Sequence, residues 1–253
     1  MDAAGFYREN GYYHARGVFD AGEVEEMRAA IEQILADVEG TANDENHRWN
    51  TAEKETVLKG FHNVQYHAAA FTRAVAHPGI VAVLTQLIGP NVQLHHTKML
   101  VKPPEKGAPF PMHQDHPYFP HERHTMLAAS VHLDDTDEEN GCLHVVPASH
   151  LRGPLEPTGE SKSLDVPLEE GIPVPCAAGD VLFFNYLTIH GSGVNRSARV
   201  RRNVLFQYRD PEDRPLTKDG VEEHVNWGQG LMVAGRNPVY WQTRPRFTVL
   251  AAA

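Results

Sequence analysis

The amino-acid sequence predicts a mainly β protein whose helices are gathered at its N-terminal end. Up to about residue 90, apolar residues recur at helical spacing. From residue 92 onward the apolar period changes to two, and short apolar runs alternate with turn-rich segments. Many short strands with regular turns are typical of a sandwich or barrel-like core. The N-terminal helices are expected to pack on one face of that core.

The first clear helix is predicted to begin after Asp20. Asp20 and Glu23 have the spacing of a helix N-cap and its capping-box partner. The apolar residues that follow form one stripe at helical spacing: Val24, Met27, Ile31, Ile34, Leu35 and Val38. Gly40 is the expected glycine just past the helix end. We assign this helix a packing role.

Two further N-terminal segments follow this helix. Residues 41–56 are polar and without periodicity, which predicts a loop. Residues 66–88 carry a second helical pattern. Pro78 is expected to start a new helix segment within that pattern, because proline suits a first helical turn and disrupts a helix interior.

The strand pattern begins at Val92. Alternation predicts that one face carries Val92, Leu94, His96, Lys98 and Leu100, and that the other carries Gln93, His95, Thr97, Met99 and Val101. Residues 153–170 are rich in Pro, Gly, Ser and Glu, which predicts a long surface insertion or lid. Further strands are predicted from short apolar runs at residues 126–133, 142–147, 181–186 and 203–208.

Length suggests the domain organisation. A chain of 253 residues is predicted to form one domain covering residues 1–253. Within it we expect a helical part over about residues 1–90, a β core over about 91–210 and a C-terminal extension over about 211–253.

Composition excludes several classes of protein. The formal net charge of −10 argues against a nucleic-acid partner. Two cysteines, Cys142 and Cys176, do not suggest a disulfide framework, which favours a reduced, cytoplasmic setting. No apolar run approaches the ~20 residues that span a bilayer, so no membrane association is expected.

His113 and Asp115 are the most informative pair in the sequence. If this segment is extended, side chains at positions i and i+2 lie on one face and point to the same spot. A second histidine, His190, follows a predicted buried strand. Two histidines and one carboxylate on one side of a metal leave the opposite positions open, which is typical of non-haem Fe(II) oxygenases. Taken alone, the His-x-Asp pair is equally compatible with a hydrogen-bonded pair at a strand end.

Arg201 is the candidate for binding an anion. A cosubstrate with a distal carboxylate requires a planar, bidentate and permanently charged partner, which arginine provides better than lysine. Alternation places Arg201 on one face of a predicted strand with Asn203, Leu205 and Gln207. The alternative is that the neighbouring arginines form a solvated edge that pairs with acidic residues elsewhere.

A family resemblance connects these residues. The matching stretches are residues 96–104, 113–120, 140–150, 179–184 and 189–195, together with Arg201. With these motifs the sequence resembles the phytanoyl-CoA dioxygenase family of Fe(II)- and 2-oxoglutarate-dependent oxygenases over roughly residues 5–210. The resemblance implies a double-stranded β-helix core, also called a jelly-roll or cupin-like core, with N-terminal helices.

The resemblance also implies roles for individual residues. It assigns iron ligation, and with it the catalytic role, to His113, Asp115 and His190. It assigns binding of the distal 2-oxoglutarate carboxylate to Arg201, helped by Ser192.

Three more cosubstrate contacts are implied by position in the motifs: Lys98, Gln114 and Lys59. Val131 stands where some relatives place a tryptophan over the cosubstrate, so the upper wall of the pocket is expected to differ. His116 is expected to line the pocket mouth or the surface, because a site with three protein ligands has no room for every nearby histidine.

The function implied is that of a dioxygenase that uses Fe(II), 2-oxoglutarate and O2 to hydroxylate an unactivated C–H bond of a small organic substrate, releasing succinate and CO2. Asp115 favours hydroxylation, because halogenating relatives replace this carboxylate with a small residue. Two alternatives stay open: a catalytically silent jelly-roll binding or sensor protein, and a zinc hydrolase that uses the same three ligands. Acyl-CoA thioesters, amino acids and natural products all stay open as substrates, as do a monomer and a homodimer.

Overall fold

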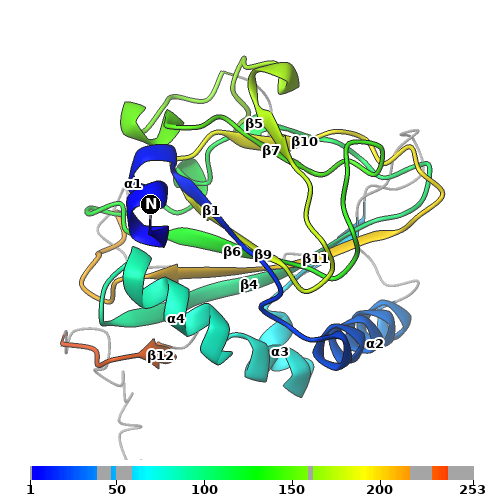
Figure 1. Cartoon of the computed structure of the whole chain (residues 1–253), viewed down its shortest axis with the longest axis horizontal. Coiled ribbons are helices and arrows are strands. Elements are labelled where there is room, and N and C mark those ends of the chain that lie inside the picture. The colour runs from blue at the N-terminus through cyan, green and yellow to red at the C-terminus, as the bar shows by residue number, and fades with distance from the viewer. Residues whose placement is uncertain (1, 39–46, 50–58, 159–161, 217–229, 239–253) are drawn as a thin grey trace, which may run out of the picture.

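Two antiparallel sheets face each other, and helices cover the outer face of the larger sheet (Figure 1). The computed structural model describes residues 2–38, 47–49, 59–158, 162–216 and 230–238. The eight-stranded sheet runs in the order β1 (Tyr12–Ala15), β9 (Val181–Asn185), β6 (Leu127–His132), β11 (Arg201–Arg209), β4 (Val92–Lys102), β3 (Lys59–His62) and β2 (His47–Trp49), with β12 (Met232–Ala234) paired to β4. The four-stranded sheet runs in the order β5 (Phe110–His113), β10 (His190–Ser192), β7 (Leu143–Val145) and β8 (Ile172–Val174).

The α-helices are α1 (Ala3–Asn10), α2 (Ala21–Asp37), α3 (Ala69–Ala74) and α4 (Pro78–Leu87), and the short 3-10 helices are η1 (Val64–Tyr66), η2 (His116–Tyr118), η3 (Ser149–Arg152) and η5 (Leu168–Glu170). The predicted capping box of α2 is present: the Glu23 backbone N–H donates to Asp20 and the Asp20 backbone N–H donates to Glu23. Pro78 starts α4, as predicted. None of the helices in the described ranges combines the length and the apolar character needed to span a membrane.

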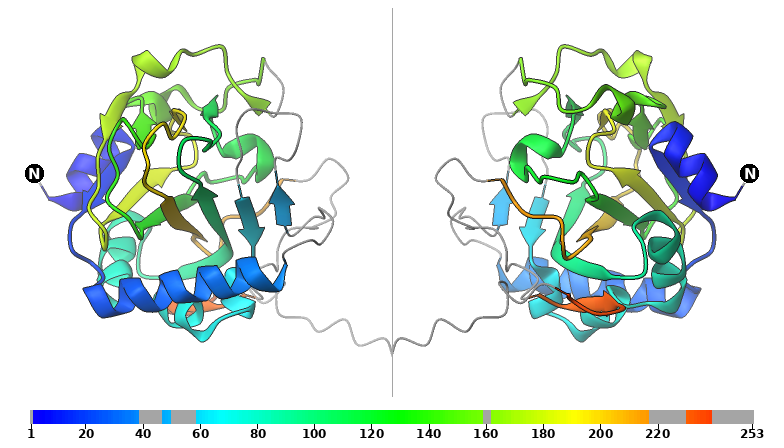
Figure 2. Two further views of the ribbon diagram at one scale, coloured as in Figure 1. Left: turned by 90° about the vertical axis from the view of Figure 1, so that its right-hand side faces the viewer. Right: turned by 90° about the vertical axis from the view of Figure 1, so that its left-hand side faces the viewer.

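Strand alternation divides the apolar residues of the large sheet between two hydrophobic clusters. Outward-facing residues of the large sheet, among them Val131, Phe183 and Phe206, join α2, α3 and α4 in the main core. The side views show α2 lying along this face of the sheet (Figure 2). Inward-facing residues such as Leu182 and Phe184 meet the small sheet instead. The candidate site lies between the inner faces of the two sheets, and its side chains come from these faces and from the turn that follows β5.

The predicted alternation of β4 fails at one point. The ladder to β11 shifts register at Gln207, where Gln207 pairs with His96 and the next residue pairs with Leu94. This bulge at His95 turns Val92 and Leu94 outward, where they join Met99 and other residues of the helix-side core. A β-bulge inserts one residue and reverses the alternation beyond it. His96 and the residues after it keep the predicted faces.

The N-terminal part contains strands that the sequence pattern does not predict. β1 pairs with β9, and β3 pairs with β4. The prediction of a loop over residues 41–56 is wrong in part, because His47–Trp49 forms β2. The rest of that segment, and Gly40, lie outside the described residues. The described part of the predicted 153–170 insertion packs several of its apolar residues against β5 and β10.

Candidate metal centre and cosubstrate pocket

His113 and His190 face each other across the small sheet. His113 is the last residue of β5, and His190 is the first residue of β10. The two residues are directly paired in the antiparallel ladder, and their ring centroids are 4.3 Å apart. Residues directly opposite in such a ladder project to the same face. The fold therefore brings the two predicted histidines together.

Asp115 reaches the same point by a different route from the one predicted. The strand ends at His113, and Asp115 has helical dihedral angles (φ −73°, ψ −24°) just before η2. The turn, and not the alternation of an extended strand, directs its carboxylate back to the histidines. Asp115 Oδ1 lies 3.6 Å from His113 Nε2 and 3.8 Å from His190 Nε2.

Hydrogen bonds fix which nitrogen of each histidine faces Asp115. His113 Nδ1 lies 2.8 Å from the Pro111 carbonyl oxygen, and His190 Nδ1 lies 2.9 Å from the Thr188 carbonyl oxygen. A carbonyl only accepts, so each Nδ1 carries the hydrogen and each Nε2 presents a lone pair. This is the arrangement that supports a metal-binding histidine. The three candidate donor atoms all lie within 4.8 Å of one another, so a single cation can bridge them.

The charges of the three groups also suit a cation. Burial would raise the pKa of Asp115, but the contact with His113, the charge that His190 carries at low pH and the hydrogen bond from Gln207 together hold that pKa well below its usual range. Burial, and then His113, lower the pKa of His190 to about 4. At neutral pH the site offers a carboxylate and a neutral imidazole, the forms that bind a metal. Gln207 Nε2 donates to Asp115 Oδ2 at 2.8 Å, which leaves Oδ1 to face the histidines.

Arg201 is a buried cation that has no carboxylate partner among the described residues. It is 3% exposed, and no acidic side chain in the described ranges lies within ion-pair distance of it. Its Nε makes no hydrogen bond to any described group. Burial lowers the pKa of Arg201 only to about 10, so the guanidinium stays charged. An unpaired buried charge is expensive, which points to an anionic ligand as its partner.

Lys102 lies beside Arg201, and Ser192 is hydrogen-bonded to Lys102. Lys102 is directly opposite Arg201 in the ladder between β4 and β11. The Lys102 Nζ donates to Ser192 Oγ at 2.7 Å and to the Gly193 carbonyl oxygen at 2.6 Å. The sequence prediction includes Ser192 but not Lys102. The available signal was the alternation of β4, which places Lys102 on the face of Lys98 and Leu100.

The other predicted cosubstrate contacts have different outcomes. Lys98 lies on the same inner face as Lys102, opposite Leu205. Lys59 belongs to β3, but its side chain lies outside the described part of the structure.

The structure gives Gln114 a structural role instead of the expected place in the pocket. Its Nε2 donates to the carbonyl oxygens of Leu187 and Gly153, and its Oε1 accepts from the Leu155 N–H. The side-chain amide is therefore occupied by the protein.

Val131 does not form the upper wall of the pocket. It points into the helix-side core, with no exposed surface. Its neighbours Ser130 and His132 face inward in its place, opposite Leu205 and Asn203. Neighbouring positions in a strand face opposite sides, so Val131 itself is not part of a pocket wall on the inner face.

Comparison with known proteins decides the family. The sequence pattern described as Phytanoyl-CoA dioxygenase (PhyH) matches residues 7–203. The chain belongs to the phytanoyl-CoA dioxygenase family. It is 32% identical to a probable alpha-ketoglutarate-dependent hypophosphite dioxygenase of Stutzerimonas stutzeri, covering 92% of this chain and 86% of that protein. It is 27% identical to the peroxisomal phytanoyl-CoA dioxygenase of Rattus norvegicus, covering 86% and 70%.

A solved structure supports the same assignment. The epimerase SnoN in complex with Fe3+, alpha ketoglutarate and nogalamycin RO superimposes with a TM-score of 0.71 at 31% identity, covering 87% of this chain and 86% of that chain. The predicted jelly-roll fold is confirmed. The predicted enzyme class, a 2-oxoglutarate-dependent non-haem iron dioxygenase that uses Fe(II), 2-oxoglutarate and O2, is confirmed at the level of the family.

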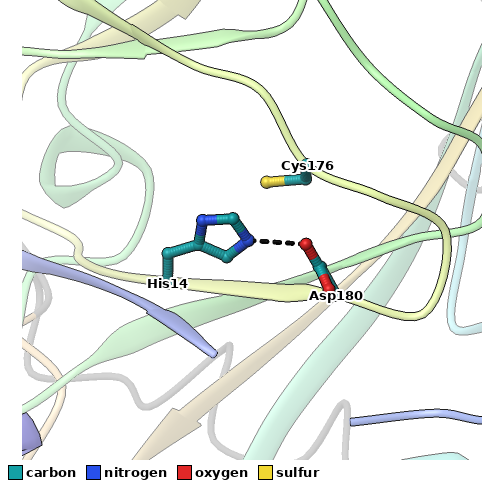
Figure 3. Close-up of side chains that lie close together, drawn as sticks. All are labelled: His14, Cys176 and Asp180. Atoms are coloured by element: carbon teal, nitrogen blue, oxygen red, sulfur yellow. Dashed lines mark hydrogen bonds and ion pairs between the residues drawn. The ribbon is translucent and has the colours of Figure 1, made fainter. Parts of the chain in front are cut away.

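This phytanoyl-CoA dioxygenase family member has a second cluster of metal-ligand residue types: His14, Cys176 and Asp180 (Figure 3). Its groups are already bonded to protein. Asp180 accepts from the backbone N–H groups of Gly17 and Ala177, and its Oδ2 lies 2.7 Å from His14 Nε2. Burial, and then Asp180, raise the pKa of the Cys176 thiol to about 12, so it is not a ready thiolate. We interpret the cluster as a structural bond between β1 and the turn before β9.

Replacing His14 with alanine tests this interpretation. We expect the free energy of unfolding to fall by about 1–3 kcal/mol, because the partly buried Asp180 loses a hydrogen-bond partner. The amount of iron bound per chain should not change. Urea unfolding and metal analysis after dialysis against Fe(II) measure the two quantities. Loss of a second equivalent of bound metal in His14→Ala would contradict the structural role.

His132 makes a testable contribution to acid sensitivity. It is fully buried, and burial, and then Arg201, lower its pKa to about 3 from the ordinary 6.5. The folded protein keeps the ring neutral, whereas the unfolded chain takes up a proton below pH 6.5. Unfolding therefore binds a proton, and stability falls as the pH is lowered from 6.5 toward 3, by about 1.4 kcal/mol per pH unit.

The matched variant is His132→Leu, studied as metal-free protein. Because leucine cannot titrate, the difference in unfolding free energy between the two proteins should change by about 2 kcal/mol between pH 6.5 and 5.0, in favour of the variant. Urea unfolding at the two pH values measures it. Parallel pH dependences of the wild-type and variant proteins would show that His132 does not stay neutral in the folded protein.

Proposed function

We propose that this protein is an Fe(II)- and 2-oxoglutarate-dependent dioxygenase that hydroxylates an unactivated C–H bond of a small organic substrate. The observation that carries the proposal is the pairing of two features on facing sheets. One is the set of two lone-pair-presenting histidines around Asp115. The other is the buried guanidinium of Arg201, which has no carboxylate partner among the described residues.

In this proposal the iron would be held by His113 Nε2, His190 Nε2 and one oxygen of Asp115. Three protein ligands would leave positions for the cosubstrate and oxygen. When bound, the iron supplies the activation of O2 that oxidises the substrate. The protein contributes geometry: backbone carbonyls orient both imidazoles, and Gln207 orients Asp115.

Arg201 would bind the distal carboxylate of 2-oxoglutarate. A guanidinium forms two parallel hydrogen bonds to a carboxylate, and burial strengthens them. Ser192, hydrogen-bonded to the Lys102 that pairs with Arg201, would donate a further hydrogen bond. Held at this end by Arg201, the cosubstrate would have its 2-oxo acid end free to bind the metal. The reaction would convert 2-oxoglutarate and O2 to succinate and CO2, with one oxygen atom entering succinate and the other entering the substrate.

Each of the two alternative functions fails to explain one feature of the site. A zinc hydrolase needs the three ligands and a bound water, but it gives no reason for a buried Arg201 that no described carboxylate pairs. A silent binding protein explains ligand binding but does not need an open side on the metal. The structurally similar SnoN is an epimerase, so a related fold that binds alpha ketoglutarate also serves an outcome other than hydroxylation. Asp115 is the residue that favours hydroxylation here, because it fills the metal position that a halide would need.

The test is product analysis under 18O2. The purified protein is supplied with Fe(II), 2-oxoglutarate and a panel of small acids, amino acids and acyl-CoA thioesters. We expect succinate above the no-iron background, an increase with one substrate class, and one 18O atom in that product. Product formed with zinc in the absence of oxygen would support the hydrolase instead. Iron and 2-oxoglutarate binding with no succinate under any condition would support the sensor.

A further inference from the structure

Lys102 is a buried lysine for which the proposed chemistry does not yet account. Its side chain is 1% exposed, and it lies opposite Arg201 in the β4–β11 ladder. Two basic groups opposite each other in a sheet would repel if both were charged, and no described acidic residue lies within ion-pair distance of either. A purely structural position would be filled better by an apolar side chain. The pair therefore needs an explanation in terms of function.

The hydrogen bonds of Lys102 define what it can do. Its Nζ donates to Ser192 Oγ at 2.7 Å and to the Gly193 carbonyl oxygen at 2.6 Å. Burial, and then Arg201, lower the pKa of Lys102 to about 6, so the amine is mostly neutral at pH 7.5 and has two hydrogens to donate. Both hydrogens are used by these two acceptors. Lys102 therefore has no hydrogen left for an anion bound at Arg201.

Ser192 is left with an unused hydrogen. Its oxygen accepts from Lys102, so the hydroxyl hydrogen must point away from that amine. No described group accepts that hydrogen, although Ser192 is 1% exposed. Arg201, across the ladder from Lys102, has an unused Nε–H. Lys102 thus contacts Ser192 and is paired with Arg201, and each of these two residues keeps an unused donor that a carboxylate could accept.

We propose that Lys102 is a positioning residue for the cosubstrate: by donating to Ser192 Oγ, it turns the Ser192 hydroxyl hydrogen toward the carboxylate bound by Arg201. This inference rests on the proposed function, because it takes 2-oxoglutarate as the anion. The competing explanation is that Lys102 only ties β4 to β10. The two explanations differ in whether the effect of Lys102 passes through Ser192 and whether it depends on a distal carboxylate.

A mutant cycle with two probes separates them. The proteins are wild type, Lys102→Met, Ser192→Ala and the double variant, each loaded with Fe(II) without oxygen. The probes are 2-oxoglutarate and 2-oxobutyrate, which carries the same 2-oxo acid but no distal carboxylate. The dissociation constant of each probe is measured from the visible charge-transfer band of the iron chelate. Circular dichroism and thermal melting show that each variant is folded.

We expect each single variant to weaken 2-oxoglutarate binding about 10-fold, since each removes the oriented hydrogen bond to a charged group. The double variant should be no weaker than the singles, and 2-oxobutyrate binding should change less than about 2-fold throughout. Additive losses, or equal losses for both probes, would overturn the positioning role. A wild-type protein without a band would overturn the proposed function and this inference with it. If Lys102→Met does not fold, Lys102→Gln takes its place, and its effect must likewise be lost in the Ser192→Ala background.

Discussion

Replacing Arg201 with methionine is expected to weaken 2-oxoglutarate binding about 100-fold or more while leaving the free protein at least as stable as wild type. The loss of affinity follows because a buried charged partner of the carboxylate is removed. The stability follows because Arg201 is a buried cation without an acidic partner among the described residues, so an apolar side chain of similar length removes an unfavourable burial. Anaerobic cosubstrate titration and urea unfolding measure the two effects.

Arg202 provides the matched control, because it lies on the opposite face of the same strand. Its guanidinium pairs with Asp134 at 2.9 Å and with Glu32 at 3.0 Å. We expect Arg202→Met to leave 2-oxoglutarate affinity unchanged and to lower the unfolding free energy by about 1 kcal/mol. If the two variants lose cosubstrate affinity equally, Arg201 is not the carboxylate partner.

Replacing His113 with alanine is expected to lower the affinity for Fe(II) by at least about 100-fold. The variant keeps only two of the three metal-binding groups. Replacing even a residue that only hydrogen-bonds to a metal ligand typically lowers metal affinity by about 10–100-fold. The predicted binding is measured by equilibrium dialysis of the metal-free protein against Fe(II) without oxygen.

His116 is the control for His113, since it lies in the same segment but faces elsewhere. The centroid of its ring lies 5.6 Å from the ring centroid of His124 and 5.4 Å from that of Tyr186. His116→Ala should therefore bind iron as the wild type does. Strong iron binding by His113→Ala together with weak binding by His116→Ala would require a different set of ligands.

The predictable parts of this fold depend on local signals. The capping box between Asp20 and Glu23 and the proline at position 78 act within one helical turn, so the sequence alone locates the starts of α2 and α4. The facing of His113 and His190 depends on a distant pairing, but the matching family motifs supply it. β1 carries no such signal, because its four residues become a strand only by pairing with β9.

The parts that were missed depend on register between distant strands. The bulge at His95 is defined by the ladder to β11, and the apolar alternation of residues 92–101 does not predict it. The same ladder places Lys102 opposite Arg201, a relation that neither segment reveals alone. Gln114 was expected in the cosubstrate pocket because of its place in the motif. Its amide is instead taken by three backbone groups, including Leu187, which is far away in the sequence.

The most direct test of the central claim is anaerobic titration of the metal-free protein with Fe(II) and then with 2-oxoglutarate. We predict one iron per chain and a visible charge-transfer band that saturates at one 2-oxoglutarate per iron, since the three ligands leave adjacent positions for a chelate. The band should be absent when zinc replaces iron. Folded protein that binds iron but gives no band would contradict the proposal that His113, Asp115, His190 and Arg201 form an iron and 2-oxoglutarate site.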